Sequence, residues 1–324
     1  MSKALGLLSG GLDSSLAALC LKRQGIEVTA IAFVTPFFGA GKARRAAEKI
    51  GIPLLVHDIG AIHLDMVKRP HYGYGKNMNP CIDCHAMMFR LAGDIMVEQG
   101  FDMLFSGEVL GQRPMSQNLS ALRAVAKYSG HTDRILRPLS ARLLPETKME
   151  EQGLVDREQL LDIQGRTRRR QEALAKEWGL TDYPSSGGGC LLTEKHFSDR
   201  LRDLITHQPY CDTSDVELLK IGRQFRLSAR AKLALGRNQE DNTALAAATR
   251  AADFLLRTPG LAGPIGVVSG IPDDDDLQQA AAIVASYSKG KELPQVEVVA
   301  TAGDRERRLL VAPLPRAISE QLLL

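Results

Sequence analysis

Residues 9–15 (SGGLDSS) have side chains and spacing that suit a phosphate-bearing ligand. They follow a short apolar run and precede a helix predicted over residues 16–23. Gly10 and Gly11 allow the backbone to approach an anion closely, and the helix N-terminus adds free N–H groups and a positive dipole end. Three serine hydroxyl groups add hydrogen-bond donors: Ser9, Ser14 and Ser15. We therefore predict an anion site here; the alternative is a glycine turn with a polar helix cap.

Three of the five cysteines stand where sulfur chemistry is expected. Cys81 and Cys84 form a Cys-x-x-Cys pair, and Cys190 follows three glycines. A thiol at a helix N-terminus has a lowered pKa, so we expect Cys84 to be accessible as a thiolate. The pair alone is compatible with a zinc half-site, a redox pair, an iron–sulfur site or unlinked cysteines. No second Cys-x-x-Cys or His-x₃-His completes a zinc site.

We predict no chemical role for one histidine and two further cysteines. His85 is expected on the solvated side of its helix, and Cys20 is expected to pack in the core. Cys211 has no partner motif.

The elements that must position these residues alternate between strand and helix. Strands are predicted over residues 3–8, 28–34, 54–59 and 102–105, and helices over 16–23, 42–50 and 84–99. This alternation favours an α/β fold with a parallel sheet covered on both faces. Such a sheet binds ligands at the carboxyl ends of its strands, where residues 9–15, Cys84 and Cys190 could meet.

The second half has a different pattern. Residues 149–179 are charged and predicted to be helical, and from about residue 211 the chain reads as a smaller α+β domain. In this domain the predicted strands are 217–221, 232–235, 296–300 and 309–313, and the predicted helices begin at 244 and 277. Residues 273–276 are expected to form a turn and a helix N-terminus. The expected organisation is residues 1–180, a connector over 181–210, and residues 211–324.

Composition sets the class of protein. With 324 residues, 44% hydrophobic and 24% charged, the chain suits a soluble globular protein of about two domains. No apolar run approaches the roughly 20 residues of a membrane span, and the N-terminus lacks a signal-peptide pattern, so we expect a cytoplasmic protein. Five cysteines in a reducing compartment argue against a disulfide framework. A net charge of +3 is too small to indicate nucleic-acid binding.

The SGGxDS motif resembles the PP-loop of the ATP pyrophosphatase superfamily. The resemblance implies that ATP is split to AMP and pyrophosphate, with the loop holding pyrophosphate and Asp13 helping to place Mg²⁺. It also implies that Ala32 and Phe33 meet adenine and that Gly107 lies beneath the nucleotide. The polar segment that follows would overhang this site, and three of its side chains are candidates for contact with AMP or a target base: Gln112, Arg113 and Gln117. The alternative for that segment is a helix cap and a solvated loop.

The combination of SGGxDS, the Cys-x-x-Cys pair and a later Gly-Cys resembles the tRNA-thiolation branch of this superfamily. The relevant members are the tRNA-specific 2-thiouridylases and the tRNA 4-thiouridine synthases. In the classical 2-thiouridylase an aspartate stands where Cys81 stands here, and two cysteines act through a persulfide. Three cysteines instead resemble the iron–sulfur-dependent members, which implies that Cys81, Cys84 and Cys190 hold a [4Fe–4S] cluster with one iron open to sulfur. The persulfide route is the alternative.

The C-terminal segment resembles the RNA-binding module of NFACT proteins. The resemblance rests on Gly236-Arg237-Asn238 and on an alanine-rich helix that ends in Tyr287-Ser288-Lys289. It implies an accessory RNA-binding domain, and its basic and polar candidates are Arg223, Arg226, Arg230, Arg237 and Asn238. The arginines of the segment 165–171 are further candidates for RNA phosphates: Arg166, Arg168, Arg169 and Arg170. The alternatives are a structural domain and a solvated charged face.

The expected function is therefore that of an ATP-dependent tRNA sulfurtransferase. It would adenylate a uridine carbonyl oxygen, and sulfur held by the cysteines would then displace AMP. Its partners would be tRNA and an unidentified sulfur donor, without a membrane; a homodimer is compatible with the sequence. The alternatives are a PP-loop ligase or synthase acting on a small molecule, and an RNA-binding adaptor with a vestigial nucleotide site.

Overall fold

The computed structural model describes residues 2–184 and 189–324. The chain divides into two compact units, Met1–Thr193 and Glu194–Leu324. The boundary lies inside the segment 181–210 that was expected to be a connector. Helix α8 (Lys195–His207) begins directly after it.

The first unit is built on a five-stranded sheet. Its strands are β1 (Lys3–Leu7), β2 (Glu27–Val34), β3 (Leu54–Asp58), β4 (Met103–Ser106) and β5 (Ile135–Leu136). They lie in the order β3-β2-β1-β4-β5 and all pair in parallel. The predicted α/β class is thus confirmed, and the bounds of β1 to β4 agree with the predicted ones to within a residue. Strand β5 was not predicted.

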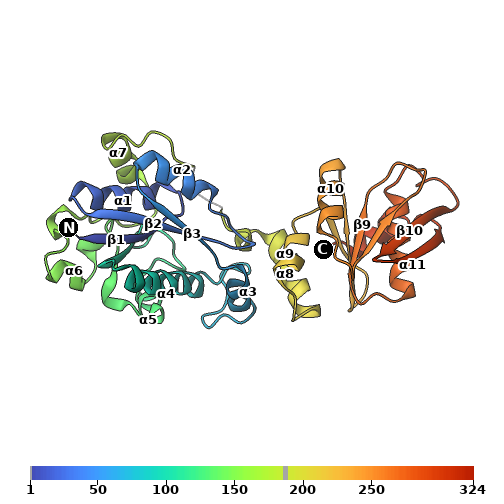
Figure 1. The fold of residues 1–324 in the computed structure, drawn as a ribbon, viewed down its shortest axis with the longest axis horizontal. Coiled ribbons are helices and arrows are strands. Elements are labelled where there is room, and N and C mark those ends of the chain that lie inside the picture. Colours follow the sequence, from blue (N-terminus) through green and yellow to red (C-terminus); the bar gives the residue numbers. More distant parts are fainter. Residues whose placement is uncertain (1, 185–188) are drawn as a thin grey trace. The chain divides into compact units, whose positions relative to one another are not determined.

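Helices cover both faces of this sheet, as Figure 1 shows. One face carries α1 (Leu12–Arg23), α2 (Gly41–Ile50) and α7 (Arg169–Glu177); the other carries α4 (Cys81–Gln99) and α5 (Leu119–Ser129). Two shorter helices complete the unit, α3 (Gly60–Lys68) and α6 (Lys148–Glu151). Because both faces are covered, the central strands are apolar on both sides.

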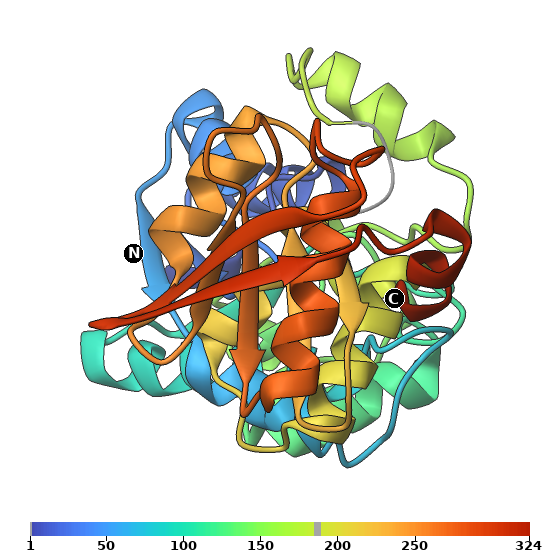
Figure 2. The same ribbon diagram turned by 90° about the vertical axis from the view of Figure 1, so that its right-hand side faces the viewer.

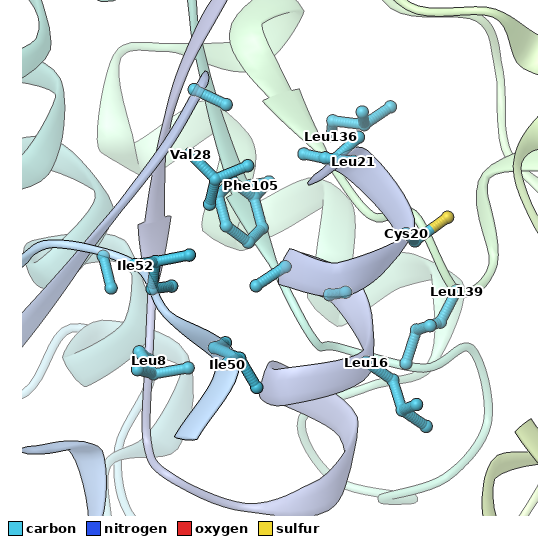
Figure 3. Close-up of a cluster of buried hydrophobic side chains, with 14 of the residues drawn as sticks. Leu8, Leu16, Cys20, Leu21, Val28, Ile50, Ile52, Phe105, Leu136 and Leu139 are labelled. Atoms are coloured by element: carbon cyan, nitrogen blue, oxygen red, sulfur yellow. The ribbon is translucent and has the colours of Figure 1, made fainter. Parts of the chain in front are cut away.

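The core on the α1 side forms where α1 crosses the sheet. Leu16, Leu21 and Phe105 are almost completely buried and lie together in the cluster of Figure 3. A Cβ atom on Gly6 of β1 would come within 2.0 Å of the Phe105 ring. The absence of a side chain at Gly6 therefore leaves space for the Phe105 ring of β4 to pack against β1.

Helices α3 and α5 lie outside the predicted set. Asn118 caps α5, because its side chain accepts a hydrogen bond from the backbone N–H of Ala121 at 2.8 Å. An asparagine after a polar loop is equally typical of a turn, so the sequence alone does not mark this helix start. Residues 149–179 are less helical than predicted, since only α6 and α7 are regular α-helices in or next to that stretch.

The second unit contains a six-stranded antiparallel sheet. Its strands are β6 (Arg223–Arg226), β7 (Ala231–Leu235), β8 (Phe254–Arg257), β9 (Gly266–Gly270), β10 (Val296–Ala302) and β11 (Arg305–Val311), in the order β11-β10-β8-β9-β7-β6. Helix α11 (Asp274–Ser286) packs along the sheet, as Figure 2 shows, and buries one continuous apolar cluster. Helix α10 (Gln239–Ala248) contributes Leu245 to a separate cluster with β7, β8 and β9. The predicted smaller α+β domain is confirmed.

One strand prediction in this unit is wrong. Residues 217–221 are not a strand, because helix α9 (Thr213–Leu218) occupies the start of that segment. Asp212 and Asp215 form a reciprocal capping box that begins the helix. The equivalent box of Asp273 and Asp276 begins α11, as predicted. In the part of the chain that the structure describes, no helix combines the length and apolar character of a bilayer span.

Candidate functional site

The anion loop lies where β1 and β4 neighbour each other in the middle of the sheet. Such a switch point in strand order opens a crevice at the carboxyl edge of a parallel sheet. A Cβ on Gly107, directly after β4, would lie 2.4 Å from the backbone nitrogen of Ser14. Gly10 has φ of +77°, and its Cβ would lie 2.3 Å from the carbonyl carbon of Lys42. Both glycines are therefore required by the fold of the loop.

Gly11 differs from these two glycines. The nearest atom to a Cβ built on it is Ser9 Oγ at 3.5 Å. Space next to Gly11 is therefore open, as close approach of a ligand to the backbone requires.

Hydrogen bonds hold the serines of the loop. The hydroxyl groups of Ser14 and Ser15 donate to the carbonyl oxygen of Gly11 at 3.0 and 3.1 Å. Ser9 Oγ lies 3.2 Å from Ser14 Oγ and accepts from the Gly11 N–H at 3.3 Å. Ser14 and Ser15 are buried whereas Ser9 is exposed. Ser14 and Ser15 thus shape the loop, and Ser9 is the hydroxyl presented outward.

Asp13 has one occupied and one free carboxylate oxygen. Its Oδ2 accepts from Gln112 Nε2 at 2.7 Å and from Arg168 Nη2 at 2.9 Å. Its Oδ1 is buried and has no hydrogen-bond partner among the described residues. A buried carboxylate oxygen without a donor suits a hard cation such as Mg²⁺.

Arg168 reaches Asp13 because its segment packs beside the β4 loop. Gly165 N–H donates to the carbonyl oxygen of Leu110 at 2.8 Å, and Gln164 forms a bridge with Leu110. Sequence reasoning grouped Arg168 with RNA-binding arginines. The structure places it at the anion loop instead, a contact over 155 positions that no local pattern indicates.

The other residues predicted to contact the nucleotide differ in whether they reach the loop. Phe33 is 5% exposed and packs in the cluster on the α4 side of the sheet, so its ring is not free to stack on a base. Gln117 is buried and accepts no hydrogen bond at Oε1 within the described residues, whereas Arg113 is exposed. Gln112 is the member of this segment that reaches the loop.

A pocket of about 140 Å³ adjoins Gly10 and Ser15. Three cationic residues of α2 line it: Lys42, Arg45 and Lys49. Lys49 also pairs with Asp182 on the opposite wall. This positive wall extends the anion-binding character of the loop.

The Cys-x-x-Cys pair forms the first turn of α4. Cys81 is the first helical residue, and Cys84 N–H donates to the carbonyl oxygen of Pro80 at 2.9 Å. Asp83 is buried between the cysteines and accepts from the backbone N–H groups of His71 and Tyr72 at 2.9 and 3.0 Å. The aspartate thereby fixes the preceding loop against the helix.

Cys190 comes to the same region from the far end of the unit. Leu191 N–H donates to the carbonyl oxygen of Phe37 at 3.0 Å, and Thr193 accepts from Asn77 Nδ2 at 2.6 Å. These contacts hold the 190–193 segment beside the loops that follow β2 and precede α4. The glycines at 187 and 188 lie outside the described residues.

The expectation of a lowered pKa for Cys84 is wrong. Burial raises its pKa well above the ordinary value, and negative charge on Cys190, Cys81 and Asp83 raises it further. These effects outweigh the dipole of the helix N-terminus. They also place Cys81 and Cys190 within electrostatic range of Cys84. Within the described chain, however, no three His, Cys, Asp or Glu side chains form a ready metal site.

His63 belongs to the cysteine site and was missed by sequence reasoning. Its Nε2 lies 3.2 Å from Cys84 Sγ, and the residue is completely buried. Burial lowers the pKa of His63 to about 4, so the imidazole is neutral at physiological pH. A single histidine in an apolar helix carries no signal that separates it from a core residue.

His85 links the cysteines to the anion loop. It does not lie on the solvated side as expected, because its Nδ1 is 2.8 Å from Glu108 Oε1. Glu108 also accepts from Arg137 Nε at 2.9 Å and is itself next to Gly107. Burial would raise the pKa of Glu108, but the charge of Arg137 and the hydrogen bond from His85 outweigh it and lower the pKa to about 2.

The other two cysteines lie elsewhere. Cys20 is 3% exposed on α1 and belongs to the cluster of Figure 3. Its thiol donates to the carbonyl oxygen of Gln159 at 3.7 Å, and burial raises its pKa to about 12. Cys211 is buried in the second unit.

Acidic residues accompany most of the arginines proposed to bind RNA in the second unit. Arg226 pairs with Asp203, Arg230 with Asp273 and Arg237 with Asp241, while Asn238 caps α10. Arg223 differs, because its guanidinium lies over the Tyr287 ring at 5.0 Å. Arg316 lies over the same ring at 5.9 Å. Arg316 also pairs with Glu320 at 3.2 Å, whereas Arg223 and Tyr287 are half-buried. These three residues, Arg223, Tyr287 and Arg316, form one cluster on this unit.

Family models match both units. Residues 1–142 match the family described as thiamine biosynthesis protein (ThiI), and residues 222–321 match the NFACT protein RNA binding domain. The predicted resemblance is confirmed. The two matches cover separate parts of the chain, as the two resemblances read from the sequence do.

Two relatives found by sequence point the same way. A tRNA-specific 2-thiouridylase MnmA from Marinobacter nauticus is 26% identical over 62% of this chain and 53% of its own length. A probable tRNA sulfurtransferase from Staphylococcus aureus is 30% identical over 42% of this chain and 34% of its own. A 4-thiouridine synthetase solved with RNA and ATP has 21% identity and a TM-score of 0.39, covering 68% of this chain and 52% of that one. The chain therefore spans about half the length of the thiouridylase and a third of the sulfurtransferase.

The ion pair beneath β4 predicts a specific acid sensitivity. Because the pKa of Glu108 is lowered from 4.5 to about 2, its charge stabilises the folded state above pH 4.5, and this contribution is lost as the pH falls toward 2. Glu108→Gln leaves Arg137 buried without its charge partner, so we expect the free energy of unfolding to fall by about 3 kcal/mol at pH 7. The difference between variant and wild type should shrink to near zero by about pH 2.

Unfolding by denaturant, followed by the fluorescence of the single tryptophan Trp178, measures this in the first unit. Glu158→Gln, at an exposed position, is the control and should change stability little at any pH. If the free energy of unfolding of Glu108→Gln stays below that of wild type by the same amount from pH 7 to pH 2, the assigned ion pair is contradicted.

Proposed function

We propose that this protein is an ATP-dependent tRNA sulfurtransferase that converts a uridine in tRNA to thiouridine. The observation that carries the proposal is a continuous set of contacts between the anion loop and the cysteines. Gly107 packs against Ser14 of the loop, the adjacent Glu108 holds His85, and His85 follows Cys84 in the chain. A phosphate site and a sulfur site at one sheet edge suit activation followed by sulfur transfer.

The activation step uses the anion loop. The carbonyl oxygen of the uridine attacks the α-phosphorus of ATP, the bond from that phosphorus to the bridging oxygen breaks, and pyrophosphate leaves. Open space at Gly11, the hydroxyl of Ser9 and the N-terminus of α1 would hold the pyrophosphate. The cationic wall of Lys42, Arg45 and Lys49 supports the binding of further negative charge.

Asp13 would hold Mg²⁺ through Oδ1, which lacks a partner among the described residues. When bound, the ion would offset charge on the phosphate oxygens. Gln112 and Arg168 fix the carboxylate by its other oxygen. Arg168 thereby also brings a positive charge to the place where pyrophosphate forms.

The transfer step uses the cysteines. Sulfide from the sulfur donor attacks the adenylated ring carbon and forms a C–S bond, the bond from that carbon to the oxygen breaks, and AMP leaves with the electron pair. We propose Cys81, Cys84 and Cys190 as ligands of a [4Fe–4S] cluster, which when bound would offer an open iron for the sulfur. The thiol donor set supports this, because burial and the charges of Cys190 and Cys81 raise the pKa of Cys84, so its anionic sulfur is costly without a cation.

The second unit would bind tRNA. Its match to the NFACT protein RNA binding domain supports this role. Arg223, which lies over the Tyr287 ring, is the side chain best suited to it, since the other candidate arginines of this unit are held by acidic partners.

The first prediction concerns ATP. Gly11→Val fills the open space at the loop, and Asp13→Asn removes a metal-organising charge, so both should lower tRNA-dependent AMP formation by about a hundredfold or more. Gly39→Val, at another glycine with open space and φ outside the left-handed region, is the matched control and should stay near wild type. Release of labelled pyrophosphate measures the effect. Unchanged release in both loop variants would overturn the enzyme assignment in favour of an adaptor.

The second prediction concerns sulfur. Serine at Cys81, Cys84 or Cys190 should remove both bound iron and thiouridine formation, whereas Cys211→Ala, at a buried cysteine of the other unit, should retain both. Anaerobic purification with iron and sulfide analysis, together with nucleoside analysis of the tRNA, provides the two measurements. Full thiolation by strictly iron-free protein would reject the cluster and favour a persulfide route. Full thiolation by all three variants would exclude these cysteines as the sulfur site and favour a ligase acting on another substrate.

The third prediction concerns tRNA. Arg223→Gln should reduce the slope of log binding constant against log salt by about 1, because one phosphate contact and its released counterion are lost. Arg230→Gln removes an exposed arginine that pairs with Asp273 and should leave the slope unchanged. Filter binding at several salt concentrations measures both. Identical slopes for wild type and Arg223→Gln would remove this cluster from the RNA interface.

A further inference from the structure

His63 occupies an unusual position for a histidine. It lies on α3 with no exposed surface, and its ring is 5.5 Å from the Phe37 ring and 5.4 Å from the Phe38 ring. One ring nitrogen, Nε2, is 3.2 Å from Cys84 Sγ. The other, Nδ1, is buried and has no hydrogen-bond partner in the described part of the chain.

These contacts decide between the two neutral forms of the ring. A neutral imidazole carries its proton on one nitrogen and accepts at the other. If Nδ1 carried the proton, a buried N–H donor would remain unpaired, which is rarer in proteins than an under-satisfied acceptor. The Nε2–H form leaves only an acceptor unsatisfied and directs its proton to the sulfur. An apolar side chain would fill the slot between the phenylalanine rings without either penalty.

Cys84 has a corresponding need for a donor. Burial and the charges of Cys190, Cys81 and Asp83 all oppose negative charge on its sulfur. His63 lies on α3 whereas Cys84 lies on α4, so the hydrogen bond joins two separate helices. A donor from a second element also fixes the direction in which the sulfur points.

We propose that His63 is a positioning residue for the Cys84 sulfur: its Nε2–H donates to Sγ, holds the side-chain rotamer and stabilises the anionic sulfur. The same bond serves a thiolate and a metal-bound sulfur, because both accept at Sγ. The inference deepens the proposed function and rests on it only in taking Cys84 as a working sulfur.

The tautomer provides the first test. In the full-length protein labelled with ¹⁵N-histidine, two-bond ¹H–¹⁵N correlation distinguishes the two neutral forms, and the His63→Gln variant assigns the signal. We expect the proton of His63 on Nε2. A proton on Nδ1 would overturn the proposal, because Nε2 would then accept from the thiol and stabilise its protonated form.

The reactivity of Cys84 provides the second test. The thiolate attacks the methylene carbon of iodoacetamide, a C–S bond forms and iodide leaves, so the rate at fixed pH reports how well the anionic sulfur is stabilised. His63→Leu removes the donor and should slow alkylation of Cys84 about tenfold or more at pH 8. His63→Gln offers an amide N–H at a similar reach and should stay within about threefold of wild type.

Tandem mass spectrometry of the peptide that carries both Cys81 and Cys84 separates the two rates, so Cys81 serves as an internal control. The protein is used at full length, as purified and again after chelation of any iron. If Cys84 is alkylated at the same rate in wild type and His63→Leu, His63 has a purely structural role. The same conclusion follows if His63→Leu and His63→Gln slow the alkylation equally. The measurement needs neither ATP nor tRNA, so its failure would leave the proposed sulfur transfer standing.

Discussion

The close approach of β4 to the first turn of α1 is the constraint on which the first unit depends. With a Cβ on Gly107 only 2.4 Å from the nitrogen of Ser14, the backbone after β4 lies directly against the N-terminus of the helix after β1. This contact sets the width of the crevice at the carboxyl edge. It also delivers Glu108 into the buried position from which it holds His85 and Arg137. Loop, sheet and cysteine helix are therefore positioned by one backbone contact.

The two halves of the site have opposite electrostatic requirements. The anion loop has open space, a helix N-terminus and a cationic wall, which together favour negative charge. Around Cys84, burial and the charges of Cys190, Cys81 and Asp83 disfavour negative charge on its sulfur unless another group compensates it. Negative charge is thus favoured at the loop, whereas negative charge on Cys84 needs a cation or a hydrogen-bond donor to offset burial.

The second unit shows why a count of arginines says little about RNA binding. Three of its candidate arginines lie against aspartates, so much of their charge is offset locally. Arg223 instead lies over the Tyr287 ring, which places a cationic group beside an aromatic ring. Such a combination suits contact with both phosphates and bases.

Local patterns were sufficient for much of the fold. Apolar runs bounded by glycines gave four strands of the first sheet, and SGGxDS located the anion loop because glycine conformation and helix capping are properties of adjacent residues. The same logic failed at residues 217–221, where Asp212 and Asp215 cap a helix through a reciprocal pair of hydrogen bonds. A short apolar segment has no periodicity of its own, so the cap decided its structure.

The sequence indicated the residues of the candidate site, but not all of the side chains that they contact. It indicated Asp13, Cys81, Cys84 and Cys190 by motif, yet the direction of the Cys84 pKa depended on burial that a motif does not contain. Arg168 on Asp13 and His63 on Cys84 were decided by the tertiary structure alone. The physical reason is that a motif records which groups are neighbours along the chain, whereas charge, desolvation and hydrogen bonding act between groups that are neighbours in space.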